Sequence, residues 1–243
     1  FRYERPQAGR QRQFNQIGVE VLGTHMPEAD VETIALAIDI LKGAGLSGMR
    51  LRLNTVGCRE CRPRYRDAVR DYLGDHVNDL CGDCKRRFER NIFRVLDCKV
   101  ESCRKLIDGV PEIDGHLCEA CGEHFARVIE LLEAVGIEYF KDKFLVRGLD
   151  YYTRTVFEIA HSALGARDAV GGGGRYDNLV EELGGPPTGA VGFSLGTEAT
   201  LLALKNSDGA DGVDASFGVC LVLVNDSVST KAFQLLSQLR TAG

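Results

Sequence analysis

Near the start of the chain, polar and apolar residues alternate strictly. The two sets are Gln16, Gly18 and Glu20 on one side and Ile17, Val19 and Val21 on the other. A period of two predicts an extended strand with one apolar face. A polar face is expected where a sheet forms the floor of a ligand site. An exposed sheet edge with cross-strand salt bridges is the alternative.

The segment 1–22 as a whole predicts two strands around the polar turn RPQAGRQR. On the first of these strands Arg2 and Glu4 share a face, because side chains two apart point the same way. An arginine and a glutamate beside a basic loop would suit a phosphate-bearing ligand and an amine donor, respectively. Ordinary salt bridges at a sheet edge remain the other interpretation.

Further elements follow from the spacing of apolar residues. Helical spacing predicts helices over 30–42 and 124–134, and a short strand is predicted over 49–53. The stretch AVGFSLGTEATLLAL predicts a strand followed by a helix. The stretch LVRGLDYYTRTVFE is different, since it places two arginines and two adjacent tyrosines in an otherwise apolar extended segment.

Beyond residue 213 the pattern changes. The continuous apolar run FGVCLVLV is typical of a buried parallel strand, and a helical pattern follows over 230–239. These two elements predict the start of an α/β domain. Residues 206–213 form its polar, glycine-containing linker.

The charge of the chain and the length of its apolar runs limit the kinds of partner that the protein can bind. The net charge of −5 argues against a protein that coats nucleic acid non-specifically. Residues 58–105 nevertheless contain thirteen Lys/Arg against nine Asp/Glu, a local excess that fits either a phosphate-binding surface or solvated helix faces. No run approaches the ~20 apolar residues of a membrane-spanning helix, so no membrane partner is expected.

Eight of the nine cysteines lie in one region and are regularly spaced. Three C-x-x-C pairs and a fourth, wider pair contain them: Cys58 and Cys61, Cys81 and Cys84, Cys118 and Cys121, and Cys98 and Cys103. Neighbouring pairs of this kind favour structural zinc. Disulfides, a redox pair or buried free thiols are the alternatives. Eight thiolates would suffice for two zinc ions, but the sequence does not show which pairs share an ion.

Four blocks of the sequence resemble, in order, the signatures of the histidyl-tRNA synthetases of class II. FRYERPQAGRQRQFNQIGVE is similar to class II motif 2, and AVGFSLGTEATLLAL stands in the place of motif 3. LVRGLDYYTRTVFE and VGGGGRYDNL resemble the two histidine-specific signatures. Because motif 1 would precede Phe1, we expect the chain to be a fragment that starts at motif 2.

The resemblance implies an α+β fold with a mainly antiparallel six-stranded sheet and flanking helices. It adds a Cys-rich insertion and the start of a C-terminal α/β anticodon-binding domain. The expected divisions are 1–53 for the catalytic core with motif 2, 54–143 for the Cys-rich insertion region, 144–205 for the core with the histidine signatures and motif 3, 206–213 for the linker, and 214–243 for the truncated anticodon-binding domain.

The resemblance also implies roles for individual residues. Arg2 and Arg147 would be catalytic, with Arg2 at the α-phosphate of ATP and Arg147 beside that phosphate and the histidine carboxylate. Glu4 would bind the adenine amine. The histidine site would comprise Gln16, Glu20, Arg147, Tyr151, Tyr152, Gly172 and Gly173. In it Glu20 and Tyr152 would face the two ring nitrogens. The acceptor end of tRNA would meet Arg5, Gln7 and Arg12.

One position departs from the family. In motif 3 an arginine that clamps the distal ATP phosphates follows the glutamate, whereas here Glu198 is followed by Ala199. Alanine offers neither a charge nor a donor. Loss of such a clamp weakens stabilisation of the transition state.

Two functions therefore stay open. The first is a cytoplasmic, homodimeric histidine–tRNA ligase that uses ATP with Mg to form histidyl-adenylate and transfers histidine to tRNA(His). The second is a non-catalytic paralogue that senses histidine as the regulatory subunit of ATP phosphoribosyltransferase. Ala199 favours the sensor, whereas the intact RGLDYYTRT and the arginine-rich motif 2 loop favour the enzyme. A third, weaker interpretation is a zinc-stabilised nucleic-acid-binding module.

Overall fold

The structure of the chain is a computed structural model. It describes residues 1, 3, 12–146, 151–165 and 168–207, together with residues 225, 228, 231–232, 234–235 and 238–239. The chain divides into two compact units, Phe1–Asp208 and Gly209–Gly243. The described residues within 231–239 are helical, as predicted. The predicted strand at 217–224 and the strand expected before Gln16 lie outside the described residues, apart from Phe1 and Tyr3.

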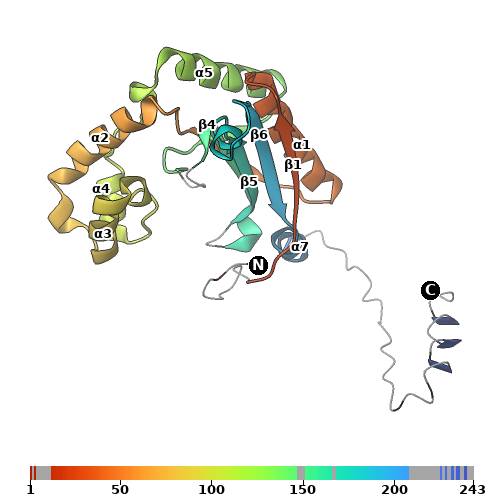
Figure 1. Ribbon diagram of the computed structural model, residues 1–243. Helices are drawn as coiled ribbons and strands as arrows, with labels where there is room; N and C mark the ends of the chain where they lie inside the picture. The colour runs from red at the N-terminus through yellow and green to blue at the C-terminus, as the bar shows by residue number, and fades with distance from the viewer. Residues whose placement is uncertain are drawn as a thin grey trace. The chain divides into compact units, whose positions relative to one another are not determined.

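Six strands of the first unit form one sheet in the order β1-β6-β5-β4-β2-β3 (Figure 1). Neighbouring strands are antiparallel except β2 and β3, which are parallel. The strands are β1 (Gln16–Leu22), β2 (Arg50–Thr55), β3 (Tyr139–Lys141), β4 (Thr153–Ala160), β5 (Ala169–Arg175) and β6 (Ala190–Gly196). The predicted α+β fold with a mainly antiparallel six-stranded sheet is confirmed.

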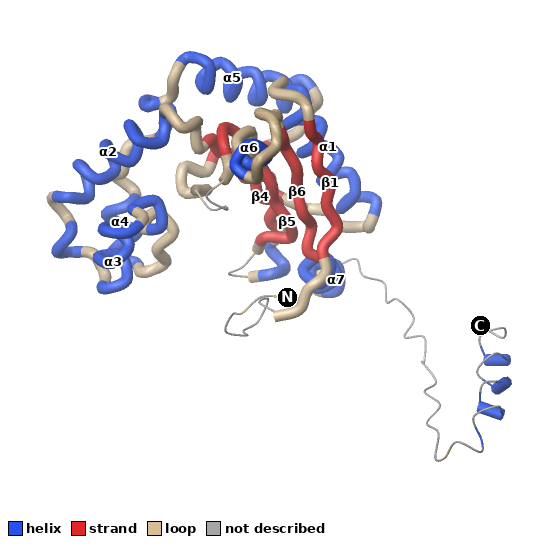
Figure 2. Tube along the Cα trace, viewed as in Figure 1, coloured by secondary structure: helices blue, strands red, loops and turns tan. Residues whose placement is uncertain are grey.

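Two helices cover one face of this sheet (Figure 2). They are α1 (Pro27–Gly43), which packs on β6, and α5 (Glu119–Ala134), which packs on α1 and β4. Their apolar residues share one core with the strands, including Ile34, Leu41, Leu53, Phe125, Leu132, Phe157, Ile159 and Phe193. Pro27 and two acidic residues in the first turn suit the N-terminus of α1, and Lys42 suits its C-terminus.

Shorter elements complete the sheet-bearing part. The helix α7 (Thr197–Lys205) follows β6 directly and contributes Ala203 to the core. The remaining pieces are η4 (Ser162–Leu164) between β4 and β5 and α6 (Leu179–Glu182) between β5 and β6. The predictions of a helix over 30–42, a strand over 49–53 and a strand followed by a helix over AVGFSLGTEATLLAL are thus confirmed.

The cysteine region forms a group of short helices with its own apolar core. The elements are α2 (Cys61–Gly74), η1 (Val77–Asp79), α3 (Gly82–Arg90), η2 (Ile92–Arg94), α4 (Glu101–Ile107) and η3 (Ile113–His116). Tyr65, Leu73 and Ile107 lie in this core. The range expected for the insertion, 54–143, contains this group and also α5 and β3, which pack with the sheet. None of the described helices combines the length and the apolar character that crossing a bilayer requires.

Candidate active site and metal centres

The face of the sheet opposite α1 and α5 is polar and rich in glycine, and we call it the open face. Residues paired across antiparallel strands point to the same face. The register therefore gives two rows on the open face: Glu20, Gly192, Gly174, Val156 and Asn54, and beside it Gly18, Ser194, Gly172, Glu158 and Arg52. The alternation predicted for β1 is confirmed for Val19, which packs against the core, whereas Ile17 of the predicted apolar face is exposed.

Glycines make room for larger side chains on this face. A Cβ on Gly192 would overlap the Glu20 carboxylate, and a Cβ on Gly174 would come within 3.1 Å of the Tyr152 ring. Both positions therefore allow a close approach that only glycine permits. The result is a shallow floor bordered by a carboxylate and aromatic rings.

Glu20 meets a cluster of three tyrosines on the open face. The Tyr176 hydroxyl donates a hydrogen bond to the Glu20 carboxylate. The Tyr151 ring contacts the other two edge-on, with ring centres 5.0 Å from Tyr152 and 5.7 Å from Tyr176. Burial, and after it the charge of Glu20, raises the pKa of Tyr151. Burial also raises the pKa of Tyr152 and Tyr176, so all three hydroxyls stay protonated at neutral pH.

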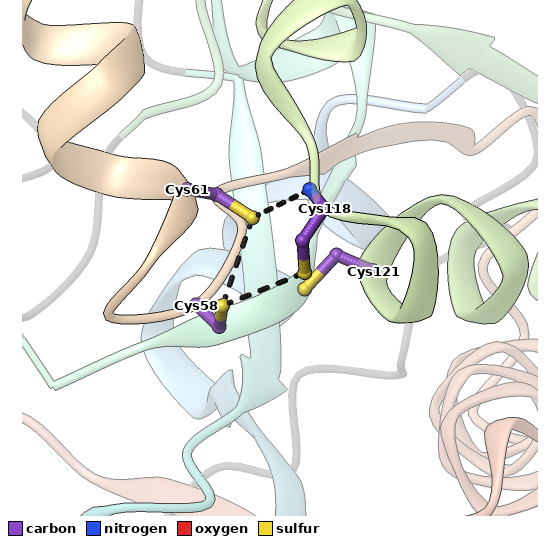
Figure 3. A group of neighbouring side chains, drawn as sticks. All are labelled: Cys58, Cys61, Cys118 and Cys121. Atoms are coloured by element: carbon purple, nitrogen blue, oxygen red, sulfur yellow. Dashed lines mark hydrogen bonds between the residues drawn. The ribbon is translucent and has the colours of Figure 1, made fainter.

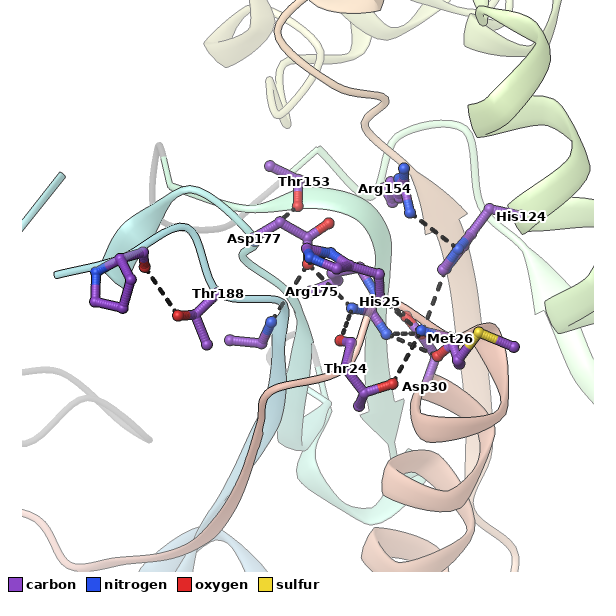
Figure 4. A network of polar contacts seen from close by, with 12 residues as sticks. Thr24, His25, Met26, Asp30, His124, Thr153, Arg154, Arg175, Asp177 and Thr188 are labelled. Carbon is purple, nitrogen blue, oxygen red and sulfur yellow. Dashed lines mark hydrogen bonds and ion pairs between the residues drawn. The ribbon is translucent and has the colours of Figure 1, made fainter. Parts of the chain in front are cut away.

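A buried ion pair next to Tyr176 joins β5 to α1 (Figure 4). The side chains of Arg175 and Asp30 are both 0% exposed, and Arg175 Nε donates to Asp30 Oδ2 at 3.0 Å. The Arg175 Nη groups also donate to the carbonyl oxygens of Thr24 at 2.8 Å and Met26 at 2.9 Å. These extra acceptors compensate the cost of burying the guanidinium.

Asp177 extends this network to the neighbouring strands. Its Oδ1 accepts hydrogen bonds from Arg175 Nη1 at 3.0 Å and from the Ala190 N–H at 3.3 Å. Its own N–H donates to Thr153 Oγ1 at 3.1 Å. Asp177 thus ties the end of β5 to the start of β4 through its N–H and to the start of β6 through its carboxylate.

His124 connects the ion pair to α5. Arg154 Nη1 lies 3.3 Å from His124 Nδ1, and because a guanidinium can only donate, the ring proton must be on Nε2. Nε2 is 3.3 Å from Asp30 Oδ2, so this N–H lies beside the carboxylate without reaching the geometry of a hydrogen bond. Burial would raise the pKa of Asp30, but His124 and Arg175 outweigh it and hold that pKa below its ordinary value.

The eight cysteines of the region gather into two groups of four, none of them in a disulfide. We call Cys58, Cys61, Cys118 and Cys121 cluster A, and Cys81, Cys84, Cys98 and Cys103 cluster B. Within each cluster all sulfur atoms lie within 4.8 Å of one another. Tetrahedral zinc with bonds of about 2.3 Å places neighbouring sulfurs about 3.8 Å apart. The geometry of both clusters therefore fits this metal.

Cluster A joins two distant parts of the chain (Figure 3). Cys58 and Cys61 stand at the start of α2, and their sulfurs are 3.6 Å apart. Cys118 and Cys121 stand at the start of α5, and the sulfurs of Cys58 and Cys118 are 3.8 Å apart. The N–H of Cys118 donates to the sulfur of Cys61 at 3.1 Å.

Cluster B is local to the short helices. The sulfurs of Cys81 and Cys98 are 3.9 Å apart, and the N–H of Cys81 donates to the sulfur of Cys103 at 3.2 Å. The N–H of Cys84 lowers the pKa of Cys81 to about 7. In cluster A burial would raise the pKa of Cys58, but N–H groups of Cys61 and Glu60 outweigh it and lower that pKa to about 7. Each cluster thus offers one readily ionised sulfur to a metal.

Arginines line a hollow of about 850 Å³ beside cluster A. The arginines among its lining residues are Arg59, Arg62, Arg66, Arg70 and Arg90. The acidic residues of the lining are Asp67 and Glu89, so positive charge predominates. Five of the thirteen basic residues of 58–105 thus line one concave surface between α2 and η2, and one of them, Arg59, also pairs with Glu181 and Glu182.

Comparison with known proteins identifies the family. A sequence model described as "Histidyl-tRNA synthetase" matches residues 1–61 and 91–200 of the chain. The chain belongs to the histidyl-tRNA synthetase family. Relatives named histidine–tRNA ligase from Natranaerobius thermophilus and Moorella thermoacetica are 48% and 47% identical over the whole chain. The chain spans 58% and 57% of the lengths of these relatives.

Solved structures agree with this assignment. The apo histidyl-tRNA synthetase of S. aureus superposes with a TM-score of 0.65 at 33% identity, over 96% of this chain and 57% of that one. A Bacillus halodurans protein described as an ATP phosphoribosyltransferase regulatory subunit/histidyl-tRNA synthetase superposes with a TM-score of 0.52 at 26% identity. That match covers 80% of this chain and 55% of the other.

The residues expected to act in a histidyl-tRNA synthetase are placed as follows. Gln16, Glu20 and Gly172 lie on the open face, and Tyr151 and Tyr152 lie in the cluster around Glu20. Gly173 points to the core, where a Cβ would overlap the Gly192 carbonyl oxygen, so only its backbone could reach a ligand. Arg12 is exposed before β1. Arg2, Glu4, Arg5, Gln7 and Arg147 lie outside the described residues.

The motif 3 position of the family lies at the start of α7. Both side-chain oxygens of Glu198 accept hydrogen bonds from the N–H of Asn15, at 2.9 and 3.0 Å, and so hold the start of β1. Ala199 is half-buried near Gly196, where an added Cβ would lie 3.5 Å from the Ala199 methyl group. Gly196 pairs with Gln16 of β1. Ala199 thus borders the open face and contributes neither a charge nor a hydrogen-bond donor from its side chain there.

Proposed function

We propose that the open face binds histidine and ATP and that the protein activates histidine to histidyl-adenylate before its transfer to tRNA(His). The observation that carries this proposal is the exposed Glu20 carboxylate, held by Tyr176, next to the ring cluster of Tyr151 and Tyr152 and over a floor of glycines. A carboxylate beside neutral phenols can satisfy both nitrogens of an imidazole, one as donor and one as acceptor. Family membership supports the same substrate.

Each predicted site residue has a role in this proposal. Glu20 accepts a hydrogen bond from one ring nitrogen and the Tyr152 hydroxyl meets the other, while Gln16 contacts the backbone end of the amino acid. Tyr151 lines the site, and Gly172 and Gly173 let the sheet backbone approach the ligand. Arg147 neutralises the histidine carboxylate and the charge that develops at the α-phosphate, as a permanent cation can.

Further residues are proposed to bind ATP and tRNA. Arg2 would bind the α-phosphate and Glu4 the adenine amine of ATP, which enters with Mg as part of that substrate. Arg5, Gln7 and Arg12 would meet the acceptor end of tRNA. The arginine-lined hollow beside α2 supports a further contact with RNA, because phosphates favour such surfaces. We expect the complete protein to act as a homodimer.

Zinc is the metal that we assign to clusters A and B. Four thiolates per site, spaced for tetrahedral coordination and partly buried, form the donor set of structural zinc rather than of a catalytic centre with an open position. Zinc would hold these thiolates ionised and would fold the short helices around them. No step of the reaction requires it.

A sensor of histidine is the second candidate. Ala199 at the border of the open face favours it, since the distal ATP phosphates lose one cation there. The similarity to the Bacillus halodurans protein described as a regulatory subunit/histidyl-tRNA synthetase supports it as well. Such a protein would bind histidine at the same residues without activating it.

Histidine-dependent ATP–pyrophosphate exchange in the complete protein separates the two functions. Exchange that requires histidine and no other amino acid would establish the enzyme. Histidine binding without any exchange would establish the sensor. Exchange supported equally by several amino acids would contradict both.

A further inference from the structure

Clusters A and B differ in what they connect. Cluster B takes all four cysteines from within 81–103, and three of them belong to the core of the short helices. Cluster A instead joins the two ends of that helical group, since Cys58 follows β2 and Cys118 precedes α5. An ion in cluster A would therefore fix both connections between the short helices and the sheet.

The backbone just before the first pair of cluster A is hydrogen-bonded to the start of β4. The N–H of Arg154 donates to the Gly57 carbonyl oxygen at 2.7 Å, and the N–H of Val56 donates to the Arg154 carbonyl oxygen at 2.7 Å. Gly57 immediately precedes Cys58. Arg154 has a φ of 50°, and among the described residues no other non-glycine residue has a positive φ. The surroundings must hold such a conformation in place.

A side chain from α2 reaches the same segment. Arg62 directly follows Cys61, and its N–H donates to the Cys58 carbonyl oxygen at 3.0 Å. Its Nη1 donates to the carbonyl oxygen of Tyr152 at 3.3 Å. The backbone of a tyrosine in the proposed histidine site is thus bound by a residue whose own backbone packs on cluster A.

The second pair of cluster A reaches the site through α5. Cys121 and His124 lie one turn apart on this helix. His124 contacts both the Arg154 side chain and Asp30 (Figure 4). Asp30 binds Arg175, and the next residue, Tyr176, donates its hydroxyl to Glu20.

We infer that the metal of cluster A positions the wall of the histidine site, residues 151–154 and the Tyr176–Glu20 pair, whereas the metal of cluster B only folds the short helices. Cluster A acts on the site by two routes. The first runs from Cys58 and Cys61 through Arg62 and the backbone of residues 56–57, and the second runs along α5 through His124. Arg62 is therefore a positioning residue, because it acts on the site through Tyr152. The inference rests on the proposed histidine site.

Paired cysteine variants test the difference between the clusters. Cys118→Ser in cluster A and Cys98→Ser in cluster B should each lower the zinc content by one ion per chain, measured by elemental analysis. Calorimetric titration with histidine should show affinity at least tenfold weaker in Cys118→Ser and changed less than twofold in Cys98→Ser. Equal affinities in the two variants would overturn the inference while leaving the proposed function intact. A wild type that binds no histidine would overturn both.

A second pair of variants keeps the metals in place. Arg62→Ala should retain both zinc ions and weaken histidine binding about fivefold, and Arg62→Lys, which can still donate to the Tyr152 carbonyl oxygen, should recover part of the loss. Arg64→Ala is the matched control, since Arg64 is exposed on the same helix and pairs with Glu60. Unchanged affinity in Arg62→Ala, or equal losses in Arg62→Ala and Arg64→Ala, would contradict the role given to Arg62.

Coupling between two sites is reciprocal, which allows a spectroscopic test. In Cys98→Ser protein loaded with cobalt(II), histidine should shift the thiolate-to-cobalt absorption bands of cluster A. In Cys118→Ser protein, in which cobalt occupies cluster B, histidine should leave the bands unchanged. Shifts of equal size in both variants, or in neither, would show that cluster A has no special connection to the site.

Discussion

Glu20 is the residue on which the selectivity of the proposed site depends. Its carboxylate is held by the Tyr176 hydroxyl and stands over Gly192. Glu20→Gln preserves the shape but removes the charge, so we expect histidine binding to weaken by ~1.5–3 kcal/mol, the range for a charge-assisted hydrogen bond. Calorimetric titration measures this loss. Equal affinities in the variant and the wild type would show that Glu20 does not bind histidine and is only a carboxylate on an edge strand.

Asp30 is the residue whose loss should cost most in stability. Asp30→Asn removes the buried ionised partner of Arg175 and leaves it only the carboxylate of Asp177, and breaking a buried pair in this way costs about 3–5 kcal/mol. Urea unfolding at neutral pH measures the change. Glu28→Gln is the control, because Glu28 lies on the same turn of α1 as Asp30 but forms an exposed pair with Arg127 of α5, so its loss should cost far less stability. Similar losses in both variants would contradict this assignment.

The Asp30–Arg175 ion pair should make the stability of the folded protein depend on pH in a defined direction. The folded pKa of Asp30 lies below the ordinary value of 3.8, so its stabilising contribution is fully present above about that pH and is lost as the pH falls through the folded pKa. Asp30→Asn protein should lack this loss of stability on acidification, and the difference between wild type and variant should shrink below that pH. A difference that stays constant down to pH 2 would contradict the ion pair as its source.

At the scale of elements, α7 places Ala199 beside the open face. Ala199→Arg would put a guanidinium where the distal phosphates of ATP are expected. We predict that histidine-dependent ATP–pyrophosphate exchange in the complete protein rises about tenfold or more while histidine affinity is unchanged. Leu201→Arg, an exposed position of the same helix, adds the same charge and should have no effect. An unchanged rate in Ala199→Arg would mean that another cation already fills this role.

The helices and strands that the sequence predicted correctly are those whose patterns involve only residues close together in the chain. The alternation in β1, the apolar spacing of α1 and the switch from β6 to α7 are all short-range patterns, and the structure confirms them. Tyr176 and Glu20 are 156 residues apart, and Arg175 and Asp30 are 145 apart, so no local pattern could pair them. Arg175 is fully buried, whereas charged residues are usually exposed. The sequence therefore did not indicate that it forms a buried ion pair.

The cysteines illustrate the same limit. Their spacing favoured zinc and their number would suffice for two ions, and the structure brings them together in two groups of four. The spacing did not show that Cys58 pairs with Cys118, 60 residues away, because that pairing depends on how α2 and α5 leave the sheet. The face on which each glycine lies was likewise decided by strand register, which separates Gly172 from Gly173.

At the scale of the whole molecule, we predict two tightly bound zinc ions per chain. Clusters A and B together bring eight sulfurs to the spacing of tetrahedral sites, and coordination stabilises thiolates more than burial as free thiols does. Elemental analysis of protein purified without added metal should give a ratio near two. Chelation should melt the short helices before the sheet, since they have a separate core. A ratio near zero with eight titratable thiols would refute this prediction.

The central claim is that the chain carries a site built for histidine. A site that hydrogen-bonds a side chain through buried polar groups rejects ligands that leave those groups unpaired, often by ~10⁴-fold. Calorimetric titration of the chain with each amino acid in turn tests the claim most directly. We predict saturable binding of histidine at one site per chain and no measurable binding of the other amino acids. Absence of histidine binding, or comparable binding of phenylalanine or glutamine, would contradict it.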